Sequence, residues 1–245
     1  MAAGSSHSGP ADDNPLLSGQ AHILYEDNHL LVVNKPAGIL VQGDYTGDAP
    51  LVEYGKQYIK KKYNKPGEVF LGVVHRLDRP VSGVVAMART SKALPRMNKL
   101  FQEGRVEKTY WALVHQAPPQ EADTLVHWLT KDSNKNKATA HRREVPASKR
   151  AELSYRLVAQ HDKLFLLEVL PRTGRPHQIR VQLASLGCPI RGDLKYGSPT
   201  PNPDASISLH ARSLSFIHPV KKVPLRVTAP LPGEEGWRGF FGIDG

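Results

Sequence analysis

The chain has 245 residues, of which 33 are Lys or Arg and 23 are Asp or Glu, so its formal net charge is +10. Hydrophobic residues make up 40% of it, enough to bury a core, and this argues against wholesale disorder. No apolar run approaches the roughly 18 to 20 residues of a membrane helix, and the single cysteine, Cys188, excludes an internal disulfide. We therefore expect a cytoplasmic protein that contacts no membrane and binds an anionic partner, most simply a nucleic acid.

Residues 1–20 are rich in Ala, Gly, Ser, Asp and Pro, and we expect a flexible tail there, followed by a single domain over residues 21–245. Short apolar runs in the first half predict strands, and two stretches with helical spacing predict helices. Ser91 is the expected N-cap of the second helix. The expected strands cover residues 22–26, 30–33, 69–74, 84–88 and 105–115, and the expected helices cover residues 52–63 and 91–103.

Residues 131–150 hold seven Lys or Arg side chains and two carboxylates, a net of +5, which is half of the excess. A hairpin or loop that clamps a polyanion is one interpretation, and a solvated flexible loop is the other. After this segment, apolar runs predict further strands, and a turn at residues 173–176 leads into a helix that ends at Gly187. These later strands are expected over residues 151–159, 164–170, 208–216 and 223–228.

Strands outnumber helices in this pattern, and most connections are too short to hold a crossover helix. We therefore predict an α+β fold with a mixed, mainly antiparallel central sheet flanked by helices. The change of composition near residue 131 marks the expected meeting point of two half-subdomains.

A charged segment at residues 75–83, His-Arg-Leu-Asp-Arg-Pro-Val-Ser-Gly, lies between two apolar strands and must form a loop. Asp78 stands between Arg76 and Arg79, which favour its ionised form. An ionised carboxylate suits a nucleophile, and it suits a surface ion pair equally well. This segment alone does not separate the two interpretations.

Two further segments carry side chains that could act in a site. Residues 173–180, Thr-Gly-Arg-Pro-His-Gln-Ile-Arg, begin a helix, where backbone N–H groups attract anions. Arg175 and Arg180 are five positions apart, so one can contact a phosphate while the other turns inward to a carboxylate; a solvated helix start is the alternative. In the strand at residues 105–115, alternation places Lys108 and Tyr110 on one face, where a tyrosine ring either stacks on a base or belongs to the core.

Taken together, in order and spacing, these segments resemble the motifs of the RluA-type pseudouridine synthases, and the resemblance extends over residues 22–230. It includes Asn-Lys-Pro-Ala-Gly at residues 34–38 and further segments at residues 190–197 and 209–219. The chain departs from the family pattern at Val81 and Pro176, where Thr is common. It has no counterpart of the N-terminal S4 domain of many relatives, so we expect RNA affinity to come from the catalytic domain.

The resemblance implies a monomeric enzyme that isomerises specific uridines in rRNA or tRNA to pseudouridine, without a cofactor and without a metal. Asp78 would be the catalytic nucleophile, paired with Arg180, and Tyr110 would stack on the target base and assist proton movement. Attack on the sugar, formation of a glycal and addition to the base all remain open for Asp78. Arg76 would fill the stack that the flipped uridine leaves. The other implied contacts are Lys108, Arg175 and His177 for positioning or phosphate, Leu209 as an apolar wall under the base, and Arg142 and Arg143 in the clamp.

Two other classes of function stay open on the sequence. A non-catalytic RNA-binding or ribosome-assembly factor could use the same fold, although the presence of Asp78 favours the enzyme. A glycosidase-like hydrolase would need two carboxylates near one site, for which Asp78 and Asp193 are the candidates. The eleven histidines lack the spacing of metal ligands, so we expect no metal site.

Overall fold

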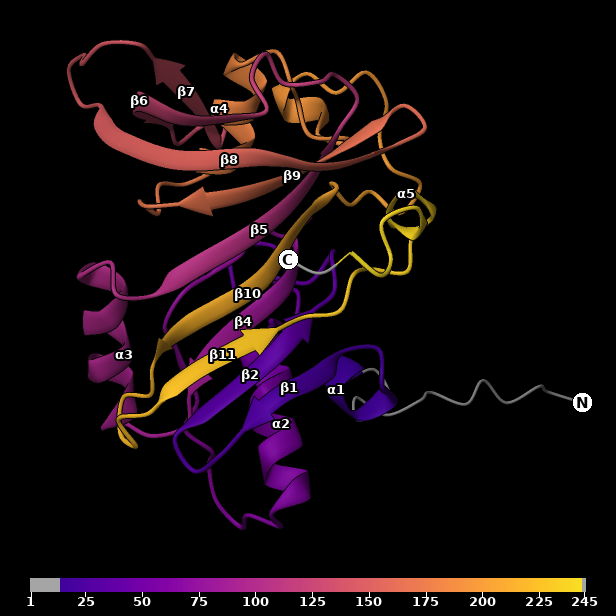
Figure 1. The fold of residues 1–245 in the computed structure, drawn as a ribbon. Helices are drawn as coiled ribbons and strands as arrows, with labels where there is room; N and C mark the ends of the chain where they lie inside the picture. Colours follow the sequence, from indigo (N-terminus) through magenta and orange to yellow (C-terminus); the bar gives the residue numbers. More distant parts are fainter. Residues whose placement is uncertain (1–13, 244–245) are drawn as a thin grey trace, which may run out of the picture.

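The structure, a computed structural model, describes residues 14–243. Within them eleven strands are found: β1 (His22–Glu26), β2 (Leu30–Lys35), β3 (Gly72–Val73), β4 (Ser82–Ala88), β5 (Glu107–Val114), β6 (Ala122–Asp132), β7 (Lys137–His141), β8 (Lys149–His161), β9 (Leu164–Pro171), β10 (Leu209–Ile217) and β11 (Pro224–Thr228). They form one sheet in the order β1-β2-β4-β10-β5-β9-β8-β6-β7, to which β3 is added on β4 and β11 on β10 (Figure 1).

Strand directions in this sheet confirm the predicted mixed, mainly antiparallel arrangement. Every pair of named strands is antiparallel except β4 and β10, which run parallel at its centre. At this parallel pair Gly83 lies opposite Ala211 with a φ of +116°, and a Cβ at residue 83 would overlap the Ala211 backbone. Only glycine therefore allows the two strands to approach as they do.

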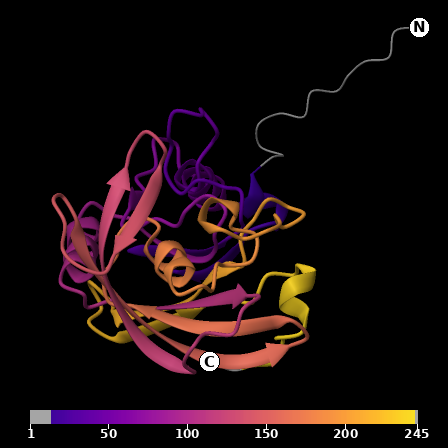
Figure 2. The same ribbon diagram turned by 90° about the horizontal axis from the view of Figure 1, so that it is seen from above.

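Three longer helices cover the sheet: α2 (Leu51–Lys62), α3 (Ala93–Gln102) and α4 (Gln178–Ser185). Shorter elements are α1 (Pro15–Ser18), the 3₁₀ helix η1 (Leu194–Tyr196) and α5 (Glu235–Arg238). Seen from above, the strands curve around α4 (Figure 2).

The two faces of the sheet carry different cores because successive side chains of a strand point to opposite faces. On one face Val33 and Val85 pack with apolar residues of α2 and α4 in the largest cluster. On the other face Val32 and Val84 pack with Met97 of α3. The helices α2 and α4 therefore lie on the face that holds the largest core.

Of the tail that we expected over residues 1–20, the structure describes residues 14–20, and these include the short helix α1. Asn14 is fully buried: its side chain accepts from Leu16 N at the start of α1 and donates to the Tyr54 carbonyl and the Gln57 side chain of α2. These contacts fasten residues 14–18 to the domain, because a buried amide that caps a helix leaves no freedom to the turn. The rest of this prediction falls on residues 1–13, which lie outside the described residues.

Other expectations need smaller corrections. The strand expected over residues 69–74 is only two residues long, because Pro66 and Gly67 begin an irregular segment that continues to Leu71. The N-cap position of α3 is Lys92 and not Ser91; the Lys92 side chain makes no cap hydrogen bond, and the Thr90 hydroxyl accepts from Ala93 N at 3.1 Å. Residue 131, near which we expected two half-subdomains to meet, lies at the end of β6.

The search for membrane-spanning segments gives a negative result for residues 14–243: no helix among them has both the length and the apolar character that a span requires.

Candidate active site

The loop that carries Asp78 is fastened to the turn after β2. Lys35 at the end of β2 is fully buried, and its Nζ donates to three carbonyl oxygens, including that of Arg79 at 3.2 Å. The Gly38 N–H donates to the Arg79 carbonyl at 2.8 Å, and Arg79 Nε donates to the Gly38 carbonyl at 2.9 Å. The Asn-Lys-Pro-Ala-Gly turn at residues 34–38 therefore fixes the backbone on one side of Asp78.

The pKa of Lys35 is shifted by two opposing effects of its surroundings. Burial lowers the pKa of Lys35 to about 7, while the charge of Asp78 acts in the opposite direction. The sequence pointed to this segment through the resemblance but gave Lys35 no task. Its task in the structure is to hold carbonyl groups of the two loops together.

Arg180, in the first turn of α4, joins two carboxylates. Its Nε and Nη2 donate to the two oxygens of Asp193 at 2.7 and 2.8 Å, and its Nη1 donates to Asp78 Oδ2 at 2.8 Å. Burial opposes the charged form, but the hydrogen bonds and charges of both carboxylates outweigh it and raise the pKa of Arg180 above its ordinary value. The guanidinium therefore remains a fixed cation with a fixed orientation.

Asp193 is the residue of this cluster whose role the sequence missed. It lies in the segment before η1, is 1% exposed, and uses both oxygens on Arg180. It therefore has no free oxygen for acid–base work, and the hydrolase interpretation loses its second carboxylate. The only sequence signal was a carboxylate in Arg-Gly-Asp at residues 191–193, within a segment that resembled the family.

The two oxygens of Asp78 have different surroundings. Oδ2 accepts from Arg180, and His177 Nε2 lies 3.8 Å from the same atom. Oδ1 has no hydrogen-bond or ion-pair partner among residues 14–243, and the side chain is 31% exposed. One oxygen thus anchors the carboxylate, while the other makes no hydrogen bond or ion pair with any of residues 14–243.

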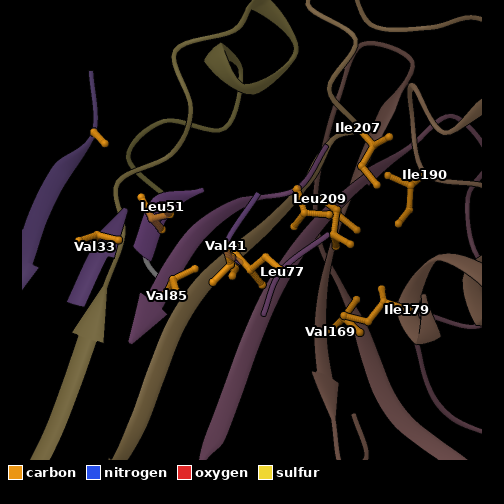
Figure 3. Packing of buried hydrophobic residues seen from close by; sticks show 14 of the residues in the cluster. Val33, Val41, Leu51, Leu77, Val85, Val169, Ile179, Ile190, Ile207 and Leu209 are labelled. Carbon is orange, nitrogen blue, oxygen red and sulfur yellow. The ribbon is translucent and has the colours of Figure 1, made fainter. Parts of the chain in front are cut away.

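Tyr110 and Leu209 lie on the face of the sheet that holds the site. Tyr110 on β5 pairs with Ala211 of β10 and is partly buried against the largest core. Burial raises the pKa of Tyr110, and the negative charge of Asp78 raises it further, so the phenol keeps its proton at neutral pH. Leu209 is 3% exposed and belongs to the same cluster as Leu77 and Ile190 (Figure 3).

Lys108 lies two positions before Tyr110 on β5, but the register of β5 against β10 shifts between these two positions, so Lys108 pairs with Leu214, which belongs to the cluster on the other face. Burial lowers the pKa of Lys108. Its Nζ lies 4.0 Å from where a Cβ on Gly174 would stand, so it reaches the turn before α4. Lys108 is thus close to the segment at residues 173–180 that precedes and begins α4.

The structure separates the residues that we had grouped as RNA contacts. The His177 side chain is 8% exposed and lies against Asp78, so it belongs to the inner cluster. Arg76 is exposed and makes no hydrogen bond or ion pair with any described residue. Arg175 is exposed as well and donates to the Arg150 carbonyl at 3.1 Å. Arg76 and Arg175 therefore lie on the rim of the site.

The basic segment forms a hairpin at its start, one of the two forms that we expected. Residues 128–132 of β6 pair with β7 in antiparallel register. Arg142 and Arg143 are exposed and follow β7 directly. The Ala138 N–H of β7 donates to the Tyr196 hydroxyl at 2.8 Å, which ties the hairpin to η1. The hairpin thus stands beside the site, although Arg142 and Arg143 do not contact Asp78.

Some motif residues serve the fold. His75 Nε2 accepts from the Ala86 N–H at 3.0 Å and its ring stacks on Phe101, while burial lowers the pKa of His75 to about 3 and keeps it neutral. Thr173 accepts from Glu152 N and donates to the Gln178 side chain. These side chains hold the loops that present Asp78 and Arg180.

The search for metal ligands among residues 14–243 finds no group of three or more His, Cys, Asp or Glu side chains that could hold an ion.

Replacing Asp193 tests whether Arg180 depends on it. We expect Asp193→Ala to lower the free energy of unfolding by about 3–5 kcal/mol, because it leaves a buried guanidinium short of a partner. Asp48→Ala removes an ion pair with Arg79 whose side chains are 51% and 45% exposed, and it should cost less than about 1 kcal/mol. Urea denaturation of both variants measures the difference, and equal losses would show that Asp193 is not a buried anchor.

Comparison with known proteins supports the assignment that the motifs suggested. The family model described as RNA pseudouridylate synthase matches residues 29–185. Ribosomal large subunit pseudouridine synthase C of Buchnera aphidicola subsp. Schizaphis graminum is 36% identical over 222 residues, which are 86% of this chain and 67% of that protein. The tRNA pseudouridine synthase C of Vibrio cholerae is 32% identical over 89% of this chain and 93% of its own length.

Comparison of the fold with solved structures also finds RNA pseudouridylate synthases. The solved structure of human RNA pseudouridylate synthase domain containing 4 superposes with a TM-score of 0.71 at 27% identity, covering 86% of this chain and 88% of that one. The family model spans more than half of the chain, and the relatives named are more than 30% identical to it. These matches favour the enzyme over the non-catalytic RNA-binding factor that the sequence had left open. The chain belongs to the RNA pseudouridylate synthase family, with the RluA-type motifs, and is a pseudouridine synthase, an isomerase.

Proposed function

We propose that the protein isomerises specific uridines of ribosomal or transfer RNA, with Asp78 as the catalytic nucleophile. The observation that carries this proposal is the asymmetry of the Asp78 carboxylate, whose Oδ2 is held by Arg180 while Oδ1 has no described partner. The choice of RNA rests on the relatives, which include a ribosomal large subunit enzyme and a tRNA enzyme.

The proposed chemistry begins with attack of Asp78 Oδ1 on C1′ of the target uridine. The N1–C1′ bond breaks and its electron pair leaves with the uracil, which then rotates so that C5 faces C1′. Attack by C5 expels the aspartate, the C5 proton is lost, and N1 takes up a proton, so that no atom is gained or lost overall. Removal of the C2′ proton by the same oxygen would give the glycal instead, and both routes need Oδ1 free and ionised.

The apolar surroundings suit this sequence of steps. Leu209 and Leu77 are buried beside the site and limit the water that could intercept the detached uracil. The protonated phenol of Tyr110 offers a ring on which a base stacks, a contact that is worth about 1–3 kcal/mol per base. We assign Tyr110 to holding the base and Leu209 to the wall beneath it.

The RNA must present its uridine outside the helical stack. Extrusion of a base costs a few kcal/mol. The exposed guanidinium of Arg76, two positions before Asp78, has no partner among residues 14–243 and would fill the space that the base leaves. Lys108 and Arg175 flank the turn before α4 and would contact phosphates. The hairpin β6–β7 with Arg142 and Arg143 would grip the RNA further out.

Replacement of Asp78 by Asn removes the carboxylate and keeps the size and shape of the side chain. We expect Asp78→Asn to reduce pseudouridine formation by about 1000-fold or more and to leave the RNA dissociation constant within about twofold. Release of tritium from RNA labelled at uridine C5 measures the reaction, because C5 loses its proton only when the glycosidic carbon takes its place.

Asp162→Asn is the matched control, since Asp162 is 86% exposed in the turn between β8 and β9 and the change is chemically the same. Tritium release by Asp78→Asn at the rate of this control would rule out the nucleophilic role.

The hairpin is tested by the salt dependence of RNA binding. We expect Arg142→Gln with Arg143→Gln to weaken binding and to reduce the slope of log Kd against log salt by about 1.5, if each arginine neutralises one phosphate. Lys60→Gln with Lys61→Gln, on the exposed side of α2, removes the same charge elsewhere. Filter binding across a salt series distinguishes them; equal slopes for the two double variants would contradict the clamp.

A further inference from the structure

The hydroxyl of Tyr196 connects the basic hairpin with the active site. It accepts from the Ala138 N–H of β7 at 2.8 Å, and it lies 2.8 Å from His177 Nδ1. The Tyr196 ring is 8% exposed and packs with Leu129 and Val181. The hydroxyl therefore makes both of its hydrogen bonds at a buried side chain.

The direction of the second hydrogen bond follows from the number of protons available. One lone pair of the Tyr196 oxygen is taken by Ala138 N–H, and the hydroxyl proton has His177 Nδ1 as its only acceptor among the described residues. The hydroxyl therefore donates to Nδ1, because the opposite direction would leave a buried O–H without an acceptor. In a neutral imidazole the ring proton then resides on Nε2.

The neutral form of His177 is favoured by its surroundings. Burial lowers the pKa of His177, Asp78 acts against this, and the positive charges of Arg180, Lys195 and Lys131 lower it again. An uncharged ring with its proton on Nε2 is what the hydrogen bond to Tyr196 requires.

His177 Nε2, which would carry this proton, lies near Asp78 but beyond hydrogen-bond distance. His177 Nε2 lies 3.8 Å from Asp78 Oδ2, the oxygen that Arg180 also holds. The same tyrosine touches Arg180, whose guanidinium carbon lies 5.1 Å from the Tyr196 ring centre. His177 itself has a φ of +54°, a backbone conformation that needs support from its neighbours.

We propose that Tyr196 is a positioning residue of the isomerisation: it fixes the Nε2–H tautomer and the ring orientation of His177, which thereby directs a second donor at Asp78 Oδ2 and leaves Oδ1 for the substrate. The inference rests on the proposed role of Asp78. It assigns to Tyr196 an effect on the rate of the reaction and none on RNA affinity.

Tyr196→Phe tests this because it removes the hydroxyl and keeps the ring over Arg180. We expect kcat to fall about tenfold or more, in the range found when an outer hydrogen-bond partner of a functional histidine is lost, with KM unchanged. Nitrogen-15 NMR of the histidine-labelled protein should show the Nε2–H tautomer at His177 in the wild type and a mixture of tautomers in the variant. The His177 signals are identified by their loss in His177→Gln.

Tyr155→Phe is the matched control. Tyr155 is also buried in the sheet, and its hydroxyl donates to the Gln120 carbonyl at 3.2 Å, away from the site. This variant should keep the wild-type kcat and the His177 tautomer.

Several outcomes would overturn the proposal. Finding the Nδ1–H tautomer of His177 in the wild-type protein would contradict it. An unchanged tautomer or an unchanged kcat in Tyr196→Phe would contradict it as well. In the His177→Gln background, Tyr196→Phe should lower kcat no further, and an additive loss would show that Tyr196 acts by another route. The tautomer of His177 is measured by NMR in the absence of reaction, so this test does not depend on the role of Asp78. The proposed role of Asp78 would be contradicted only by an active Asp78→Asn variant.

Discussion

The site depends on one interaction, the buried fork of Arg180 between Asp193 and Asp78. A guanidinium buried to 6% exposure would be costly alone, and two carboxylates so close would repel each other. The attraction between the guanidinium and the two carboxylates offsets both costs. The two carboxylates contribute unequally, because Asp193 accepts from Arg180 through both oxygens and Asp78 through one. The pairing therefore fixes the position of Asp78 and leaves its other oxygen without a partner among residues 14–243, as the proposed nucleophilic role requires.

The fold brings together site residues from distant parts of the chain. Asp78 precedes β4, Tyr110 lies on β5, and Arg180 begins α4 on the face that holds the largest core. The parallel pairing of β4 with β10 brings Leu209 beside the Asp78 loop, and it requires a glycine at position 83. Lys35 then ties that loop to the turn after β2 through carbonyl groups. The apolar sheet thus serves as a rigid support on which a few polar side chains are placed.

The sequence predicted the sheet and the segments of the site better than it predicted their connections. Periodicity predicted the strand that carries Lys108 and Tyr110, because alternation depends only on local backbone geometry, but it could not predict the register shift between these two positions. The burial of Asp193 against Arg180, 13 positions away, and the bond from Tyr196 to Ala138, 58 positions away, depend on tertiary contacts that no local pattern encodes. The same limit explains the packed turn at Asn14, whose partners lie on α2.

The measurement that tests the central claim most directly is the single-turnover rate of pseudouridine formation by Arg180→Lys at saturating RNA. Lysine keeps the positive charge but is a point donor, which cannot hold both oxygens of Asp193 and one oxygen of Asp78 in a fixed plane. The account predicts a rate about 100-fold below that of the wild type, with a folded protein that still binds RNA. A wild-type rate would show that charge alone suffices and would contradict the role given to the fork.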